Sequence, residues 1–161
     1  MSNIFIIVTA DGCGHCTRFK AQHLDNLIKM LMSTENLNII HINLPDMKGL
    51  LPTYSISDSN IFRYIKGNIR TINPKFYNMI GWFPQFFIFS TESWLDVNKP
   101  LKGKLIGGRI LDDGTIQQDP SQNIALTADS IYKWVVGSKI PTKQKVMPGY
   151  IIPSKIKYGS M

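Results

Sequence analysis

The sequence predicts an α/β protein in which a central mixed β-sheet is flanked by helices. A continuous apolar run near the N-terminus is followed by a helical pattern and a second apolar run, which is the order of a parallel βαβ unit. A third apolar run leads into a turn-rich stretch typical of a hairpin, and another helical pattern follows it. The parallel and the antiparallel strands together make the expected sheet mixed.

The first predicted strand is Ile4–Val8, which has no polar residue, as expected of a strand buried on both faces. Apolar residues then recur at helical spacing over residues 16–33. The predicted buried face of this helix consists of Phe19, Leu24, Leu27, Ile28 and Leu31. The second strand is predicted at Asn36–Leu44, parallel to the first.

The sequence after the second strand is less regular. Residues 57–67 (SDSNIFRYIKG) predict a short helix, because a serine is available as its N-cap and Ile61 and Ile65 share a helical face. Pro74 is expected to begin a helical turn that Gly81 ends, and the apolar stretch QFFIFS after it predicts the third strand.

The C-terminal part predicts a hairpin and one more helix. Residues 103–118 predict the hairpin, with Asp112-Asp113-Gly114 at its turn. The helix is expected between a Thr127 cap and Gly137. Its predicted buried face consists of Ile131, Trp134 and Val135.

The composition indicates one folded domain over residues 1–138 and a basic, proline-containing tail over residues 139–161. A hydrophobic content of 43% suits a domain with a real core. No apolar run approaches the about 20 residues of a membrane-spanning helix, and the N-terminus lacks the basic region of a signal peptide. We therefore expect a cytoplasmic protein, in a compartment where structural disulfides are rare.

The net charge of +7 is compatible with an anionic partner, although solvated surface lysines are the favoured interpretation. No RNA-binding signature or zinc-finger spacing supports a nucleic-acid partner. Part of the excess charge lies in the tail, so we expect any contact with an acidic partner there. The lysines concerned are Lys139, Lys143, Lys145, Lys155 and Lys157.

Cys13 and Cys16 carry the clearest chemical signal. They lie three residues apart where a strand gives way to a helix. If the helix begins at or just before Cys13, the pair occupies its first turn, where backbone N–H groups and the helix dipole stabilise a thiolate. Cys13 is then the more exposed attacking thiol, and Cys16 resolves the mixed disulfide. The pattern predicts a dithiol that exchanges disulfides.

His15 lies between the cysteines and, when protonated, favours the thiolate form, which makes the disulfide more oxidising. An exposed histidine without such a role is the alternative. A zinc site needs further ligands, and neither a second Cys-x-x-Cys nor suitably spaced histidines are present among His15, His23 and His41. Inert buried thiols remain the other alternative. We expect neither a metal nor a cofactor.

The order of strand, CGHC, long helix, strand and GWFPQFFIF resembles the thioredoxin superfamily over roughly residues 3–137. CGHC is the tetrapeptide typical of protein disulfide isomerase domains. The resemblance implies a thioredoxin-like fold and a cis bond before Pro84, which would face the cysteines. It further implies that the backbone of Phe83 pairs with an extended substrate segment. The residues expected to bind substrate are Gly12, Gly14, Trp82 and Phe83.

Several features depart from this family. Residues 46–73 form an insertion before the proline strand, and the tail is also extra. The buried acid that the family often places six residues before the first cysteine is Ile7 here, and the tryptophan that commonly precedes that cysteine is Gly12. Asp11 near Cys13 would oppose thiolate formation. We therefore expect slower exchange than in an efficient thioredoxin, or a dependence on water for the Cys16 proton.

Gly107–Asp113 is similar to the Gly-Gly and aspartate with which glutaredoxins hold glutathione, although its acidic residues lie further along. The predicted function is that of an enzyme, a thiol–disulfide oxidoreductase acting on protein disulfides and dithiols. Glutathione or a reductase is the candidate electron donor. The alternatives are a glutathione-dependent reductase and a redox-sensing or non-catalytic binding module.

Overall fold

A computed structural model of the chain describes residues 2–48 and 51–140. Its strands form one mixed sheet in the order β3-β2-β1-β4-β5-β6-β7. They are β1 Asn3–Ala10, β2 Leu37–Leu44, β3 Phe62–Lys66, β4 Gln85–Ser90, β5 Gly103–Leu105, β6 Gly108–Ile110 and β7 Ile116–Gln118. β1 and β2 are parallel and every other neighbouring pair is antiparallel. The sheet confirms the predicted α/β class.

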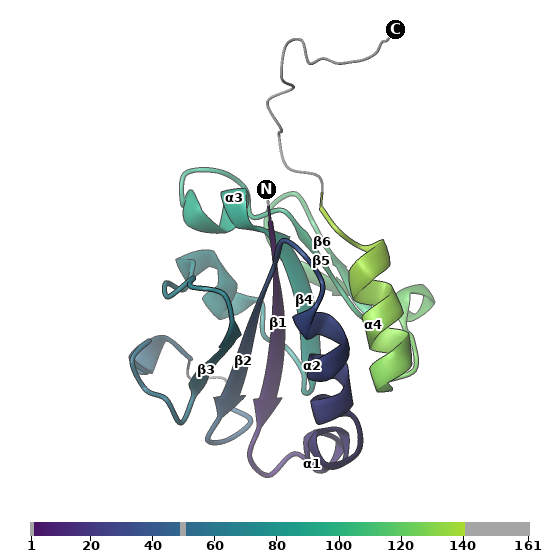
Figure 1. Cartoon of the computed structure of the whole chain (residues 1–161). Coiled ribbons are helices and arrows are strands. Elements are labelled where there is room, and N and C mark those ends of the chain that lie inside the picture. The colour runs from purple at the N-terminus through teal and green to yellow at the C-terminus, as the bar shows by residue number, and fades with distance from the viewer. Residues whose placement is uncertain (1, 49–50, 141–161) are drawn as a thin grey trace, which may run out of the picture.

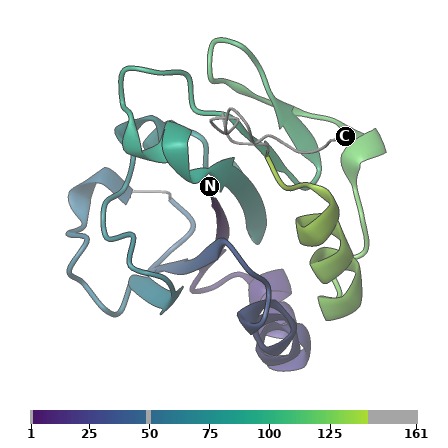
Figure 2. The same cartoon turned by 45° about the horizontal axis from the view of Figure 1, so that its top comes forward.

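The helices lie around this sheet, with α2 and α4 side by side on one face (Figures 1 and 2). The α-helices are α1 Gly14–Phe19, α2 Asp25–Met32, α3 Thr91–Leu95 and α4 Ala128–Gly137. A π-helical segment, η1 (Lys20–Leu24), joins α1 to α2. The short 3-10 helices are η2 Leu51–Thr53, η3 Pro74–Asn78 and η4 Pro120–Gln122. A crossover helix between β1 and β2 is what their parallel pairing requires.

Each face of the sheet buries its own core. The face under α2 and α4, called here the helix-covered face, is built from alternate strand residues and the apolar sides of both helices, among them Phe5, Ile7, Phe86, Leu27, Leu31 and Ile131. The opposite, aromatic face is covered by α3 and by the chain between β2 and β4. Its centre consists of Phe76, Phe87, Phe89 and Trp94, whose rings lie 4.9–5.8 Å apart.

The predicted β1–helix–β2 unit and the last helix are confirmed. All of β1 is buried, as its uniformly apolar sequence indicated. The helix over residues 16–33 is present, though interrupted by the π-helical segment. α4 begins after Thr127, whose hydroxyl accepts a hydrogen bond from the Ser130 backbone N–H, and it ends at Gly137.

The short helix predicted at residues 57–67 is wrong, because this stretch contains β3. Asp58 instead closes a turn by accepting hydrogen bonds from the backbone N–H groups of Ile61 and Phe62. The chain then pairs antiparallel with β2, placing Phe62 opposite Ile42 and Tyr64 opposite Ile40. The β-branched and aromatic side chains of IFRYI gain more from this half-buried edge position than from a helix.

Three further boundaries differ from the predictions. The turn that begins at Pro74 ends at Asn78 rather than at Gly81. The stretch predicted as a hairpin forms three short strands, β5 to β7, with the Asp-Asp-Gly turn between the last two. The cysteine helix begins at Gly14, so Cys13 is its N-cap residue.

The predicted insertion over residues 46–73 leads from β2 through β3 toward β4 (Figure 1). The predicted basic tail lies outside the described residues, except for Lys139 and Ile140. The backbone N–H of Ile140 donates to the side-chain oxygen of Asn3 at 2.9 Å, so the described chain ends beside the start of β1. No helix in the described ranges is long and apolar enough to cross a membrane.

Candidate active site

The two cysteines lie at the edge of the sheet where β1 ends. β1 gives way to an exposed Asp11-Gly12 turn, in which Gly12 has a φ of +81°. This left-handed conformation favours glycine, and it turns the chain from the strand into α1. Cys13 follows at once as the N-cap, and Cys16 lies in the first turn of the helix.

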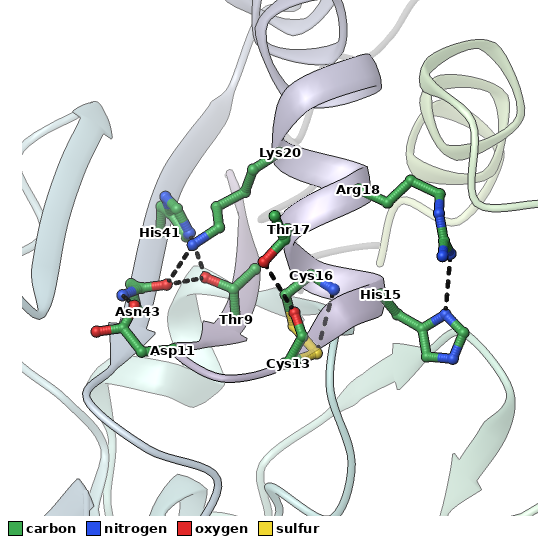
Figure 3. The surroundings of a disulfide bond; sticks show 10 residues. All are labelled: Thr9, Asp11, Cys13, His15, Cys16, Thr17, Arg18, Lys20, His41 and Asn43. Carbon is green, nitrogen blue, oxygen red and sulfur yellow. Dashed lines mark hydrogen bonds between the residues drawn. A yellow bond between two sulfur atoms is a disulfide. The ribbon is translucent and has the colours of Figure 1, made fainter.

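Cys13 and Cys16 form a disulfide pair, with Cα atoms 5.2 Å apart (Figure 3). The Cys16 backbone N–H donates to Cys13 Sγ at 3.1 Å. Thr17 holds the same turn, since its hydroxyl and its backbone N–H both donate to the Cys13 carbonyl oxygen. A free N–H group of the helix N-terminus therefore points at the sulfur of Cys13, which is the arrangement that stabilises negative charge there.

Both cysteines are largely buried. Cys13 is 5% exposed and Cys16 is fully buried, so the predicted order of exposure is present but the difference is small. They pack at the end of the aromatic-face core, which Trp82 and Phe83 also contact. Little of the Cys13 surface is therefore open to a substrate disulfide.

His15 lies on the exposed side of α1. Its Nδ1 atom is 3.3 Å from a guanidinium nitrogen of Arg18, and both side chains extend away from the disulfide (Figure 3). Arginine can only donate, so Nδ1 accepts this hydrogen bond and carries no proton in this arrangement. In this arrangement the positive charge near the start of the helix therefore comes from Arg18 and not from His15.

The Phe83–Pro84 peptide bond is cis, as the resemblance implied. The antiparallel register places Val8 of β1 opposite Gln85, so Pro84 lies at the same edge of the sheet as the cysteines. Trp82 stands between two cavities, of about 1270 Å³ and about 280 Å³, and lines both. Pro84 lines the smaller cavity. The predicted substrate-binding residue Trp82 thus lies next to open surface, and Phe83 beside it is half-buried.

The glycine pair likened to a glutathione site has a packing role. A Cβ atom on Gly108 would lie 2.6 Å from the Gln117 carbonyl oxygen and 3.5 Å from the Trp82 indole. Asp113 accepts hydrogen bonds from the hydroxyl and backbone N–H of Thr115, which lower the pKa of its carboxyl group. The aspartates therefore belong to the β6–β7 turn, as the hairpin interpretation predicted.

A buried polar network beside the cysteines was missed by the sequence analysis. Thr9 Oγ1 donates to Asn43 Oδ1 at 2.6 Å and lies 2.8 Å from His41 Nε2. Lys20 Nζ donates to the same Asn43 oxygen at 2.9 Å, and Asn43 Nδ2 donates to Asp11 Oδ1 at 3.1 Å (Figure 3). Because the Thr9 proton is used toward Asn43, His41 Nε2 must be the donor to Thr9.

His41 is neutral in this network. Burial lowers its pKa to about 4, and the nearby cations Arg63 and Lys20 act in the same direction. Part of the signal for the network was available in the sequence. Thr9, His41 and Asn43 are polar residues at alternate positions near the carboxyl ends of two parallel strands, where functional groups of α/β sheets gather.

Asp11 does not face Cys13, where the sequence analysis expected its carboxylate to oppose thiolate formation. Its carboxylate accepts from Asn43 and points away from the disulfide (Figure 3). Ile7, at the position of the family's buried acid, packs in the helix-covered core. Among the described residues, no group of three or more histidine, cysteine, aspartate or glutamate side chains is placed to hold a metal ion.

Comparison with known proteins gives no relative. No family model matches the chain, and neither the curated proteins nor the solved structures contain a match. The functional argument therefore rests on the geometry of the site.

Proposed function

We propose that this chain is a thiol–disulfide oxidoreductase of thioredoxin-like fold that acts on protein disulfides through Cys13 and Cys16. The observation that carries the proposal is the Cys16 N–H donated to Cys13 Sγ at the start of a helix. That contact lowers the cost of a thiolate on Cys13 while keeping the second sulfur within bonding reach.

The fold supports this proposal. A β1–α1–β2 crossover, an antiparallel β4 preceded by a cis-proline, and a final helix on the α2 side agree with the thioredoxin-like arrangement. The mixed sheet alone hosts many functions, so the cysteine geometry carries more weight than the topology.

The reaction proceeds in two exchanges. The Cys13 thiolate attacks one sulfur of a substrate disulfide, a Cys13–substrate bond forms, and the other substrate sulfur leaves as a thiolate. Cys16, deprotonated, then attacks Cys13 Sγ, so that the Cys13–Cys16 bond forms and the second substrate thiolate leaves. A dithiol or glutathione returns the pair to its reduced state. Phe83 and Trp82, beside Pro84, are the proposed contacts for the substrate backbone and side chains.

The test is turnover of a disulfide-containing model protein, with dithiothreitol as electron donor and new thiols as readout. Cys13→Ser should reduce the rate to the uncatalysed level, and Cys16→Ser should accumulate a covalent mixed disulfide visible by mass. Met32→Ser, on the exposed side of α2, serves as the folding control. Full turnover by Cys13→Ser would end the proposal.

The near-complete burial of both sulfurs favours one second candidate, a redox-sensing module that does not turn over protein substrates. In that case the wild-type pair would oxidise and reduce reversibly with small thiols. It would nevertheless leave the protein disulfide intact under the conditions of the same assay.

A further inference from the structure

The sheet continues beyond β4 as three short strands, β5 to β7 (Figure 1). On the aromatic face, Ile110 of β6 and Ile116 of β7 are half-buried, and the cavity of about 1270 Å³ lies against them. None of the four described α-helices contributes a residue to this cavity, called here the large cavity. An apolar sheet face is normally buried against another element, so an uncovered one indicates a binding surface.

The large cavity suits a chain segment better than a small molecule. Its volume exceeds the about 300–1,000 Å³ of typical small-ligand pockets. Gly81 and Gly114 line it, and a Cβ atom added to either would have no atom within 4 Å, so the space is open there. The apolar residues that line the cavity include Met79, Trp82, Leu101, Ile110, Leu111 and Ile116. Volume and lining together fit several side chains of one extended segment.

The charged residues that line the large cavity are balanced in sign. Lys75 and Lys102 approach from the chain on either side of β4 and α3, and Asp112 and Asp113 from the β6–β7 turn. All four are exposed. A phosphate-rich ligand is bound through an excess of cationic side chains, whereas the backbone of a polypeptide is uncharged. The lining therefore favours a polypeptide over a nucleotide or a nucleic acid.

The large cavity adjoins the candidate active site. Trp82 and Gln118 line both this cavity and the smaller one of about 280 Å³, which Pro84 also lines. The Trp82 indole lies over the glycine pair, because a Cβ atom on Gly107 or Gly108 would be 3.8 or 3.5 Å from it. An extended segment that begins beside Pro84 can therefore continue past Trp82 into the large cavity.

We propose that the large cavity binds the polypeptide on one side of the substrate's reacting cysteine, with apolar side chains of that segment against β6 and β7. The inference rests on the proposed function and specifies its substrate class as disulfides in extended polypeptides, in preference to small disulfides such as oxidised glutathione. Binding energy from this remote segment would raise the rate of exchange only for a substrate long enough to reach the cavity.

The test compares two disulfides that differ in length. One is oxidised glutathione, and the other is an unstructured peptide with one internal disulfide and apolar residues on both sides of it. The reduced full chain is mixed with an excess of either disulfide, and the remaining thiols are alkylated after an acid quench and counted by mass. In both reactions the Cys13–Cys16 pair loses two electrons and the added disulfide gains them, yielding two thiols.

The variants place a long charged side chain in the cavity. Leu111→Arg changes an exposed residue at its rim, and Ile116→Arg changes a half-buried residue of β7. Met32→Arg, at an exposed position of α2 that lines neither cavity, is the matched control.

The wild-type chain should react with the peptide at least about tenfold faster than with oxidised glutathione. Leu111→Arg and Ile116→Arg should slow the reaction with the peptide about fivefold, because an apolar segment would then meet a buried charge. Both variants should react with oxidised glutathione within about twofold of the wild-type rate. Met32→Arg should keep both wild-type rates. A loss of folding or of dithiol reactivity would slow both disulfides alike, so the selective effect identifies the cavity.

An unchanged peptide rate in Leu111→Arg would overturn the inference, and so would equal slowing with the two disulfides. A faster reaction of Leu111→Arg with the peptide would also overturn it, because the cavity would then hold the chain's own residues 141–161 or a second copy. If Ile116→Arg does not fold, Leu111→Arg decides alone. Absence of reaction with either disulfide in the wild-type chain would instead overturn the proposed function.

Discussion

The two faces of the sheet differ in what lies at their cores. The aromatic face is built around four rings and α3, and Cys13 and Cys16 belong to the same core. In Figure 1, α3 lies at the opposite end of the sheet from α1, the helix that carries Cys16. The helix-covered face is equally apolar along most of its length, yet it ends in Thr9, His41 and Asn43 beside α1. Apolar packing supplies stability, whereas buried polar groups cost free energy unless fully bonded. We infer that the four rings mainly stabilise the fold, whereas the polar end mainly holds Asp11 and the turn that leads into α1.

The largest effect is expected on the aromatic face. Trp94 is almost fully buried against Phe76 and Phe89, and its indole N–H donates to the Thr71 carbonyl oxygen. Trp94→Ala should therefore lower the free energy of unfolding by about 3–5 kcal/mol in urea denaturation. The reduction potential of the folded variant should stay at the wild-type value. Leu95→Ala, at an exposed neighbour, should change stability by less than about 0.5 kcal/mol. A large change of potential in Trp94→Ala would remove the contrast between the faces.

The next effect is a pH dependence from the helix-covered face. The pKa of His41 lies near 4 in the fold, below its ordinary value of 6.5, so between these values the unfolded chain binds more protons. Stability should fall as the pH decreases from 6.5 to 4, by about 3 kcal/mol from this residue. In His41→Gln, the unfolding free energy measured by denaturation at each pH should no longer show this dependence between pH 4 and 6.5. The His23→Gln variant should retain it. An unchanged slope in His41→Gln would place the acid sensitivity elsewhere.

A smaller loss is expected from cutting the network at its middle. Thr9→Val keeps the side-chain shape but leaves the His41 Nε2–H without its acceptor, which should cost about 1–3 kcal/mol of unfolding free energy. Thr9→Ser keeps the hydroxyl and should lose less. Equal losses in the two variants would show that the methyl packing of Thr9, and not its hydrogen bonds, matters.

The smallest effect concerns the two glycines that flank Cys13. Gly12 has a positive φ, so Gly12→Ala should destabilise the fold by about 1 kcal/mol in thermal unfolding. Gly14 is in the first turn of α1 with open space around its Cα, so Gly14→Ala should be neutral or slightly stabilising. A larger loss of stability in Gly14→Ala than in Gly12→Ala would mean that the turn into α1 does not have the backbone conformation described above.

The sequence predicted the regular parts of this molecule and missed those that depend on distant partners. β1 was predictable from its uniformly apolar sequence, and α4 was predictable from its Thr127 cap and the helical spacing of its apolar residues. β3 was mistaken for a helix because Ile61 and Ile65 fit both periods, and its pairing with β2 is decided by the rest of the sheet.

The site was predictable to a similar extent. The spacing of Cys13 and Cys16 indicated a dithiol, and the resemblance pointed to Pro84. The polar network could not be assembled from the sequence, because Lys20, at the start of η1, reaches Asn43 only when the crossover helix packs on the sheet. The turn role of Asp113 and the packing role of Gly108 likewise depend on contacts across β6 and β7.

The reduction potential of the Cys13–Cys16 pair tests the central claim most directly. The full chain is equilibrated in glutathione redox buffers, and its alkylated thiols are counted by mass. A single two-electron transition between about −270 and −180 mV is predicted, the range of thioredoxin-like redox catalysts. Two free thiols at every ratio of reduced to oxidised glutathione would contradict the account, because the pair would then not be a working dithiol.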